Sequence, residues 1–270
     1  MQGDDGCDAN LDRGLRGVVP GSGTAVSAAE AAAWAQRLGV PVLEAQPEPP
    51  GVILVADRPP ALRILGRKVP RPLQVDFAEP HLQQRLAGTT VRRDPLARAV
   101  GLHRHPAGGI VDATAGLGRD AWILAGLGAR VHAIEASPTL AALLQQALER
   151  ALDDDRLAMT ARRLQLHPGD LRQVLAWLPP PEREVIYLDP MYPEGTTRGA
   201  VGREAQTLRA LHGSGRPADE ATLLAAARAH ATGRVVVKRP QRARPVDGPA
   251  PQRSVSGRAI RFDLYAPEHG

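Results

Sequence analysis

The chain is 270 residues long, which is enough for one large domain or for a medium domain with an accessory piece. Hydrophobic residues make up 43% of it, so a sizeable core is possible, and no run of about 18 apolar residues predicts a membrane span. The formal net charge is +5, and because Lys68 and Lys238 are the only lysines, nearly all of the positive charge is arginine. A GC-rich genome explains this composition, and so does a polyanionic partner such as nucleic acid.

The first 25 residues are rich in Gly, Asp and Ser and show no period, so we expect residues 1–25 to be a disordered tail. This segment lacks the basic start and apolar stretch of a secretory signal. The single cysteine, Cys7, excludes an intramolecular disulfide and fits a reducing compartment. We therefore expect a cytoplasmic protein.

A small α+β module, rich in short strands, is expected over residues 26–90. It opens with a helix from Ser27, a suitable cap, to Leu38, before Gly39. Short apolar segments separated by proline-rich turns predict the strands that follow. These segments lie at 51–56, 61–65 and 73–77.

From residue 91 to residue 270 the pattern changes to alternating strands and helices. Such alternation predicts an α/β fold with a Rossmann-like, mostly parallel sheet that is covered by helices on both faces. Two last strands are close enough to form an antiparallel C-terminal hairpin, which makes seven strands in all. The expected strands are 109–114, 130–134, 164–167, 185–188, 234–237, 253–255 and 260–265.

A glycine turn follows the first of these strands, in the segment GIVDATAGLGRDA. Gly116 and Gly118 let the backbone turn sharply and approach a ligand, and the next helix offers free N–H groups at its start. Glu135 ends the second strand, where a carboxylate can accept hydrogen bonds from the hydroxyls of a ribose. The turn and the acid together predict a nucleotide-like cofactor at the carboxyl edge of the sheet.

The spacing Gly116-x-Gly118-x-x-Ala121 also matches the dinucleotide fingerprint, so a nicotinamide-dependent oxidoreductase is an alternative. Asp112 and Asp120 argue against it, because carboxylates would repel a pyrophosphate. They suit S-adenosylmethionine, which has an amino-acid end, a sulfonium and a ribose but no phosphate.

Asp170 ends the third strand and has two compatible interpretations. In methyltransferases of this architecture an acidic residue at this place often lies near the adenine. Asp170 is also a suitable N-cap for the helix LRQVLAWL that follows it.

The segment EVIYLDPMYPEG places a carboxylate and an aromatic ring directly after the fourth strand. A proline-rich turn explains these residues on its own, but in the predicted sheet this strand ends beside the first, next to the cofactor. The Asp189 carboxylate and the Pro190 carbonyl can accept the two N–H hydrogens of an exocyclic amine and aim its lone pair at a methyl carbon. Tyr192 can stack on the base, a contact worth about 1–3 kcal/mol. This chemistry alone leaves adenine, cytosine and guanine amines open.

The string Asp189-Pro190-Met191-Tyr192 resembles the D/N-P-P-Y/F motif of methyltransferases that act on such amines, with Met191 in place of the second proline. Four longer segments, VDATAGLGRDAWILAGLGARVHAIEASP, VIYLDPMYP, RVVVKRP and RFDLYA, resemble in their order and spacing the ribosomal RNA small-subunit methyltransferase J family. The resemblance covers about residues 90–266.

This resemblance implies a class I fold and an rRNA (guanine-N2-)-methyltransferase. It implies methyl transfer from S-adenosylmethionine to the 2-amino group of one guanosine in small-subunit (16S) ribosomal RNA. The cofactor contacts that it implies are Arg119 with Asp120, Glu135 with Ala136, Gly169 with Asp170, and Asp189.

Basic residues near this edge are expected to contact RNA phosphates. Arg198 and Arg203 lie in the segment after the motif, which is long for a loop, and Lys238 and Arg239 follow the fifth strand. For any one of them, a scattered surface charge is the alternative. A non-catalytic RNA-binding module also stays open beside the two enzyme classes. No metal and no membrane contact is expected, and naked RNA, an assembly intermediate and the 30S subunit all remain possible substrates.

Overall fold

The structure is a computed structural model of the 270-residue chain. It describes residues 12–21, 25–66, 72–104, 109–190, 203–213 and 219–269, without the side chains of residues 25, 26 and 203. The chain divides into two compact units. The first consists mainly of residues up to Gln74, with short segments at 137–139 and 200–216, and the second of most of the chain from Val75 onward.

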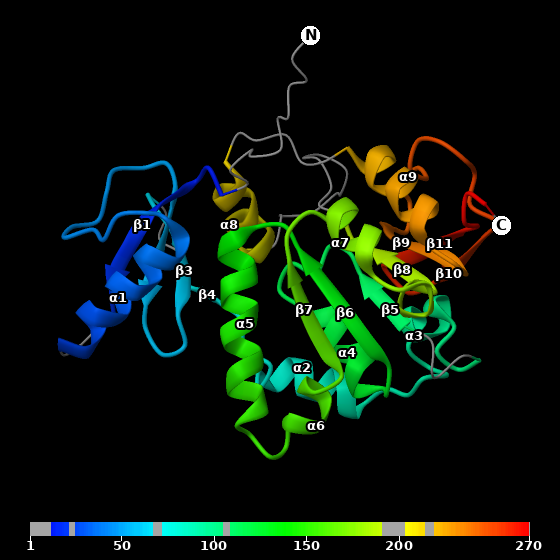
Figure 1. The fold of residues 1–270 in the computed structure, drawn as a ribbon, viewed down its shortest axis with the longest axis horizontal. Coiled ribbons are helices and arrows are strands. Elements are labelled where there is room, and N and C mark those ends of the chain that lie inside the picture. Colours follow the sequence, from blue (N-terminus) through cyan, green and yellow to red (C-terminus); the bar gives the residue numbers. More distant parts are fainter. Residues whose placement is uncertain are drawn as a thin grey trace, which may run out of the picture. The chain divides into compact units, whose positions relative to one another are not determined.

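The first unit is a small α+β structure. Its described elements are β1 (Leu15–Pro20), α1 (Ala25–Leu38), β2 (Val52–Ala56), β3 (Ala61–Ile64), β4 (Leu73–Gln74) and α8 (Arg203–His212). The strands form one sheet in the order β1–β2–β3–β4, in which β1 and β2 are parallel and the other neighbours are antiparallel (Figure 1). α1 packs against β1 and β2, and α8 packs against β2 and β3.

The second unit contains the seven-stranded sheet that the strand–helix alternation predicts. Its strands are β5 (Gly109–Asp112), β6 (Arg130–Glu135), β7 (Leu164–Pro168), β8 (Val185–Leu188), β9 (Arg234–Pro240), β10 (Arg253–Ser256) and β11 (Ile260–Tyr265). They are ordered β10–β11–β9–β8–β5–β6–β7. β9, β8, β5, β6 and β7 are parallel, and the β10–β11 hairpin joins β9 in the antiparallel sense, as expected.

Helices cover both faces of this sheet (Figure 1). They are α2 (Pro80–Ala87), α3 (Pro95–Val100), α4 (Arg119–Gly126), α5 (Pro138–Leu152), α6 (Ala158–Ala161), α7 (Leu171–Trp177), the 3-10 turn η1 (Pro180–Arg183) and α9 (Glu220–His230). α7 and α9 pack together over Ile186 and Leu188, which are fully buried. Tyr187, between these two residues, points to the other face and reaches α4. Because both faces are covered, the central strands β5 and β8 are buried along their whole length and are mostly apolar.

Three expectations about chain organisation are wrong. The expected tail at 1–25 contains β1, a short strand with Gly and Pro that is defined by its pairing with the distant β2. The boundary lies between Gln74 and Val75 rather than at 90/91, because α2 packs on α4 and Phe77 stacks on Trp122 at 4.3 Å. The segment after β8, expected to be a loop, contains α8, which buries Thr207 and Leu211.

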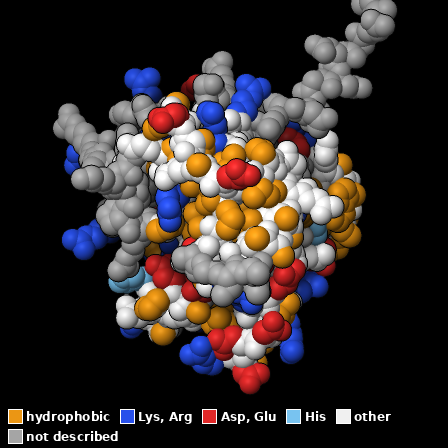
Figure 2. Space-filling view, turned by 90° about the vertical axis from the view of Figure 1, so that its left-hand side faces the viewer, with side chains coloured by type: hydrophobic (Ala, Val, Ile, Leu, Met, Phe, Trp, Pro, Cys, Tyr) orange, Lys and Arg blue, Asp and Glu red, His pale blue; other side chains and the backbone are white. Residues whose placement is uncertain are grey.

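The surface combines apolar and charged areas. The face drawn in Figure 2 shows apolar side chains gathered near its middle, with acidic and basic side chains interspersed around them. None of the helices in the described part of the chain is long and apolar enough to span a bilayer.

A histidine pair joins the two outer parallel strands of the sheet. His132 on β6 and His167 on β7 lie with Nδ1 and Nε2 2.9 Å apart, and His132 Nε2 lies 3.1 Å from Glu182 Oε2. Trp177 packs edge-on against His167. Burial, with a smaller contribution from the charge of His132, lowers the pKa of His167 to about 4.

This pair should make folding stability depend on pH between about 6.5 and 4. In that window an unfolded His167 binds a proton while the folded one does not, so stability is present above pH 6.5 and is lost as the pH falls. The loss attributable to His167 should be on the order of 2–3 kcal/mol. Urea unfolding of the parent and of His167→Gln at several pH values measures it. The Gln variant should show a flatter profile, and the exposed control His81→Gln should keep the parental slope; equal slopes in all three would contradict the assignment.

Candidate active site

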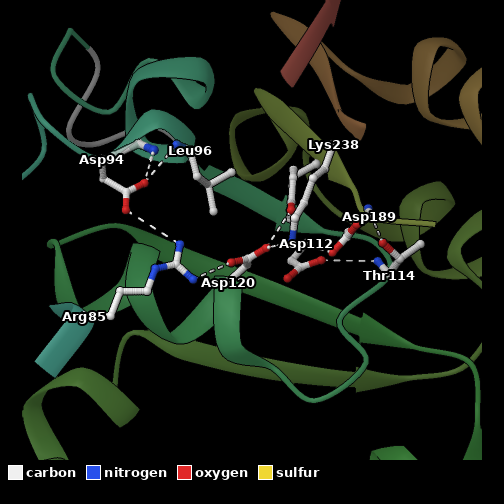
Figure 3. A network of polar contacts seen from close by, with 10 residues as sticks. Arg85, Asp94, Leu96, Asp112, Thr114, Asp120, Asp189 and Lys238 are labelled. Carbon is white, nitrogen blue, oxygen red and sulfur yellow. Dashed lines mark hydrogen bonds and ion pairs between the residues drawn. The ribbon is translucent and has the colours of Figure 1, made fainter. Parts of the chain in front are cut away.

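The carboxyl edge of the second unit's sheet carries a cluster of acids around one lysine. Asp112 ends β5, Asp189 follows β8, and Asp120 lies in the first turn of α4 (Figure 3). Lys238 projects from β9 toward the last two of these acids, and its Nζ lies 2.9 Å from Asp120 Oδ2 and 2.7 Å from Asp189 Oδ2. The register of β8 and β9 places them, since Leu188 pairs with Val237, one residue before each charged side chain.

Asp120 is held by further donors. Tyr187 donates its hydroxyl hydrogen to Asp120 Oδ2 at 2.7 Å, and Arg85 on α2 lies 3.1 Å from Oδ1. Burial alone raises the pKa of Asp120, but the positive charges of Lys238 and Arg85 outweigh it and lower that pKa to about 2. Asp120 is therefore ionised at any pH at which the protein works.

Asp112 and Asp189 are shifted in the other direction. Asp112 is buried, and this burial, together with the charges of Asp120 and Asp189, raises its pKa well above the usual range. Burial also raises the pKa of Asp189; Lys238 opposes this shift and Asp120 adds to it. The three acids thus differ in proton affinity because the positive charges around them differ: Lys238 and Arg85 both act on Asp120, whereas for Asp189 and Asp112 the opposing charge of Lys238 does not outweigh burial.

Asp189 is fixed at both its backbone and its side chain. Its backbone N–H donates to Thr114 Oγ1 at 2.7 Å, and its Oδ2 accepts from Lys238. Among the described residues no donor lies on its Oδ1, and the side chain is one-third exposed. A carboxylate oxygen at this place can accept a hydrogen from a ligand.

The glycine turn lies directly beside this cluster. Gly116 and Gly118 have φ of 56° and 70°, in the left-handed region that favours glycine. The Gly116 N–H donates to Glu135 Oε2 at 2.7 Å, so the turn is tied to the end of β6. A Cβ added at Gly118 would lie 2.6 Å from Leu144 Cδ2, whereas at Gly116 the nearest heavy atom would be 3.9 Å away.

These residues fit S-adenosylmethionine better than a dinucleotide. The carboxylates of Glu135 and Asp120 suit hydroxyl and ammonium groups, and Lys238 is already neutralised by two acids, so it offers no net charge for a diphosphate.

Asp170 fills its expected role as N-cap: it accepts from the Arg172 N–H at 2.8 Å and also pairs with the Arg172 side chain. The hydrogen bond from the Arg172 side chain, with a smaller contribution from the Arg172 backbone N–H, lowers the pKa of Asp170.

The other predicted cofactor residues lie along the same edge. Ala136, next to Glu135, is partly exposed, and Gly169 precedes Asp170 with φ of 130°. Arg119 opens α4, and its guanidinium lies 3.1 Å from Glu79 Oε2. In the described part of the chain no cluster of three His, Cys, Asp or Glu side chains is arranged to hold a metal ion.

Of the basic residues predicted to contact RNA phosphates, the structure supports neither of the two whose side chains it describes. Arg239 is buried; it pairs with Glu220 and donates to the Arg244 carbonyl, so its prediction as a phosphate contact is wrong. Lys238 lies among the carboxylates rather than on an open surface, so it too is corrected. Tyr192, Arg198 and the side chain of Arg203 lie outside the described residues.

Comparison with known proteins agrees with this geometry. Residues 34–267 match the family model described as "Putative SAM-dependent methyltransferase". The chain is 63% identical to "Ribosomal RNA small subunit methyltransferase J" of Halorhodospira halophila, over 96% of each chain. It is 49% identical to the protein of that name in Alkalilimnicola ehrlichii, over 94% of this chain and 96% of that one. The chain belongs to the ribosomal RNA small subunit methyltransferase J family.

A solved relative supports the fold of this methyltransferase J family member. The crystal structure of a SAM-dependent methyltransferase from Neisseria gonorrhoeae matches with a TM-score of 0.68 and 32% identity, over 95% of this chain and 96% of that one. The fold is therefore that of a class I methyltransferase, and its cofactor is S-adenosylmethionine. The nicotinamide-dependent oxidoreductase and the non-catalytic module are both ruled out as descriptions of this family.

Three residues of the cluster are absent from the sequence-based prediction: Arg85, Thr114 and Tyr187. Arg85 lies on α2, whose approach to α4 is a tertiary contact with no local signal. Tyr187 could have been found, because it alternates with Ile186 and Leu188 on β8 and so must face the opposite side of the sheet from them.

The two glycines of the turn should differ in their tolerance of a side chain. Gly116→Ala adds only the cost of a left-handed backbone, about 1 kcal/mol, whereas Gly118→Ala adds a clash with Leu144 and should cost about 2–4 kcal/mol. Denaturant unfolding measures both, and calorimetry with S-adenosylhomocysteine should show weaker binding for Gly118→Ala. Equal destabilisation by the two substitutions would contradict the packing argument.

Proposed function

We propose that this enzyme methylates the exocyclic 2-amino group of a guanosine in 16S ribosomal RNA, in the cytoplasm. The observation that carries the proposal is the Asp189 carboxylate, which Lys238 holds through Oδ2 beside the glycine turn and whose side chain is one-third exposed. The name shared by these relatives, "Ribosomal RNA small subunit methyltransferase J", indicates the class of RNA. The substrate is this RNA, either on its own, within the small subunit or in one of its assembly intermediates.

The residues at this edge position an amine that is a weak nucleophile. Asp189 Oδ1 and the Pro190 carbonyl accept the two N–H hydrogens of the amine, so that its lone pair points away from the protein's acceptors. S-adenosylmethionine, when bound, supplies a methyl group activated by the sulfonium. In this proposal Tyr192 keeps its predicted role as the ring that stacks on the base, which must enter unstacked from its neighbours. After transfer, Asp189 Oδ1 accepts the proton that the amine loses.

Lys238 prepares Asp189 for this role. Burial and the charge of Asp120 both favour a protonated Asp189, and a protonated carboxyl would lose an acceptor. The lysine ammonium, 2.7 Å from Oδ2, opposes this shift and favours the anionic carboxylate. Thr114 holds the backbone of Asp189 and Lys238 holds its side chain, so the two contacts together fix the orientation of the carboxylate.

The residues that would hold the cofactor follow the edge of the sheet. Glu135 would accept hydrogen bonds from the ribose hydroxyls, and Asp120 with Arg119 would contact the amino-acid end. Asp112, at the end of β5, would line the site, and Gly169 with Asp170 would border the adenine. Support for these roles comes from the acidic character of the edge and from the left-handed glycines that let the backbone approach a ligand.

Replacement of Asp189 tests the function directly. Asp189→Asn keeps the shape of the acceptor but removes its charge, and should reduce kcat by about 10²–10³; Asp189→Ala should reduce it further. Binding of S-adenosylhomocysteine should stay measurable, which shows that the site is folded. The exposed acid Asp153 provides the matched control, and Asp153→Ala should methylate at the parental rate. Unaltered activity of Asp189→Ala would refute the role of this residue.

The RNA target is tested in cells. Mass mapping of 16S rRNA from a deletion strain should show one guanosine lacking its N2-methyl group. The parent gene should restore the methyl group and the Asp189→Ala gene should not. Loss of a methyl from adenine or cytosine instead would overturn the guanine assignment, while leaving the enzyme class intact.

Replacement of Lys238 should change the pH dependence of kcat. Without the ammonium the pKa of Asp189 rises, so a larger fraction is protonated at neutral pH and activity recovers only as the pH increases. The acid limb of the kcat profile for Lys238→Met should lie about 1–2 pH units higher than that of the parent. Lys238→Arg keeps the positive charge, so the acid limb of its kcat profile should lie close to that of the parent. A uniformly lowered kcat with no shift in the limb would mean that Lys238 acts only on packing.

A further inference from the structure

A group of arginines lies along α3 and beside the starts of β9 and β10, outside the cluster described above. We name it the arginine row: Arg92, Arg93, Arg98, His103, Arg104, Arg234 and Arg253. α3 packs against β9, β10 and β11, so segments far apart in the sequence meet here. All members are exposed except Arg234, which is partly buried.

The members of the row lie close enough to act on one another. Loss of hydration and the positive charges of Arg104, Arg92, Arg234 and Arg98 lower the pKa of His103. Burial lowers the pKa of Arg234; the charges of Arg253 and Arg104 add to this effect and Glu184 opposes it. The Arg234 guanidinium also lies 3.0 Å from the place of a Cβ on Gly101, at the end of α3.

The row contains little negative charge of its own. Asp94, the one acid between Arg92 and Arg104, is buried. Its carboxylate caps the start of α3 and pairs with Arg85. Within the described residues, no carboxylate forms an ion pair with Arg92, Arg93, Arg98, Arg104 or Arg253. Uncompensated like charges at short range destabilise a fold, so such a group is expected where an anionic partner compensates them.

The row leads away from the active site. Arg92 and Arg93 directly precede Asp94, which is linked through Arg85 to Asp120 (Figure 3). At the other end, Arg234 starts the same strand that carries Lys238 four residues later. Arg234 and Lys238 are therefore about 13 Å apart along β9, and α3 is about 9 Å long. A nucleic-acid strand of three or four nucleotides spans the longer of these two distances.

We propose that the arginine row binds the phosphate backbone of the RNA strand that flanks the target nucleotide. The inference rests on the proposed function and adds a place for the RNA outside the catalytic cluster. The charge complements phosphate, and the arginine forks suit bidentate contacts with it.

A membrane surface fits the row less well. The large exposed apolar side chains of the described residues are Val42, Leu152, Met159 and Trp177, and none of them belongs to the row. A partner with repeated negative charge and no apolar anchor is therefore the best match.

The test compares Arg98→Gln/Arg104→Gln with the parent in the full-length protein. Binding of a 16S rRNA fragment is measured across a salt series, and methyl transfer is measured in parallel. The double variant should bind RNA about tenfold more weakly near physiological salt, and its slope of log affinity against log salt should fall by about 1.5–2. KM for RNA should rise while binding of S-adenosylhomocysteine is unchanged, which separates lost RNA contact from misfolding.

Arg162→Gln/Arg163→Gln is the matched control, because it removes the same charge at the start of β7, on the far side of the sheet. It should leave the salt slope near that of the parent. Equal affinity and slope for all three proteins would overturn the proposal. Normal binding of naked RNA with impaired methylation of 30S particles would also overturn it, because the row would then contact a ribosomal protein. If the parent neither binds nor methylates rRNA, the proposed function itself fails.

Discussion

The site depends on one lysine placed between two carboxylates. Asp120 and Asp189 lie at the ends of different elements, and the ammonium of Lys238, which contacts both carboxylates, lets them approach without strong repulsion. The contact requires the register of β8 and β9, in which Leu188 pairs with Val237. A slip of one residue would turn Lys238 to the opposite face, so the fold of the sheet and the chemistry of the edge are specified together.

The parallel sheet and Asp189 could be predicted because their signals are local. Apolar runs such as Val185–Leu188 mark strands that are buried on both faces, and an acid directly after such a strand must lie at the carboxyl edge. β1 and α2 could not be predicted in this way. β1 becomes a strand through its pairing with β2, and α2 matters through Arg85, whose partner Asp120 is fixed only when α2 packs on α4.

Lys238 and Arg239 are neighbours in the sequence, but their side chains lie on opposite faces of the sheet and have different roles. Successive strand residues point to opposite faces, so at most one of the two could face the acids beside α4. Lys238 does, and Arg239 turns instead toward Glu220 on α9 and the carbonyl of Arg244. The period of a strand, applied to the sequence RVVVKRP, would have separated the two roles. It would not have shown which face holds the cofactor, because that depends on the position of α4.

The distribution of charge now has a physical reason. An acidic edge suits a cationic methyl donor and an amine, but it repels the phosphates of the RNA that carries the amine. Positive charge must therefore lie near the edge without neutralising it. Arg234, at one end of the arginine row, lies four residues before Lys238 on β9, a backbone separation of about 13 Å. This exceeds the screening length of about 8 Å at physiological ionic strength, so the positive charge there and the negative charge of the acidic edge act separately. The row can then hold the RNA backbone while the base alone reaches the carboxylate of Asp189.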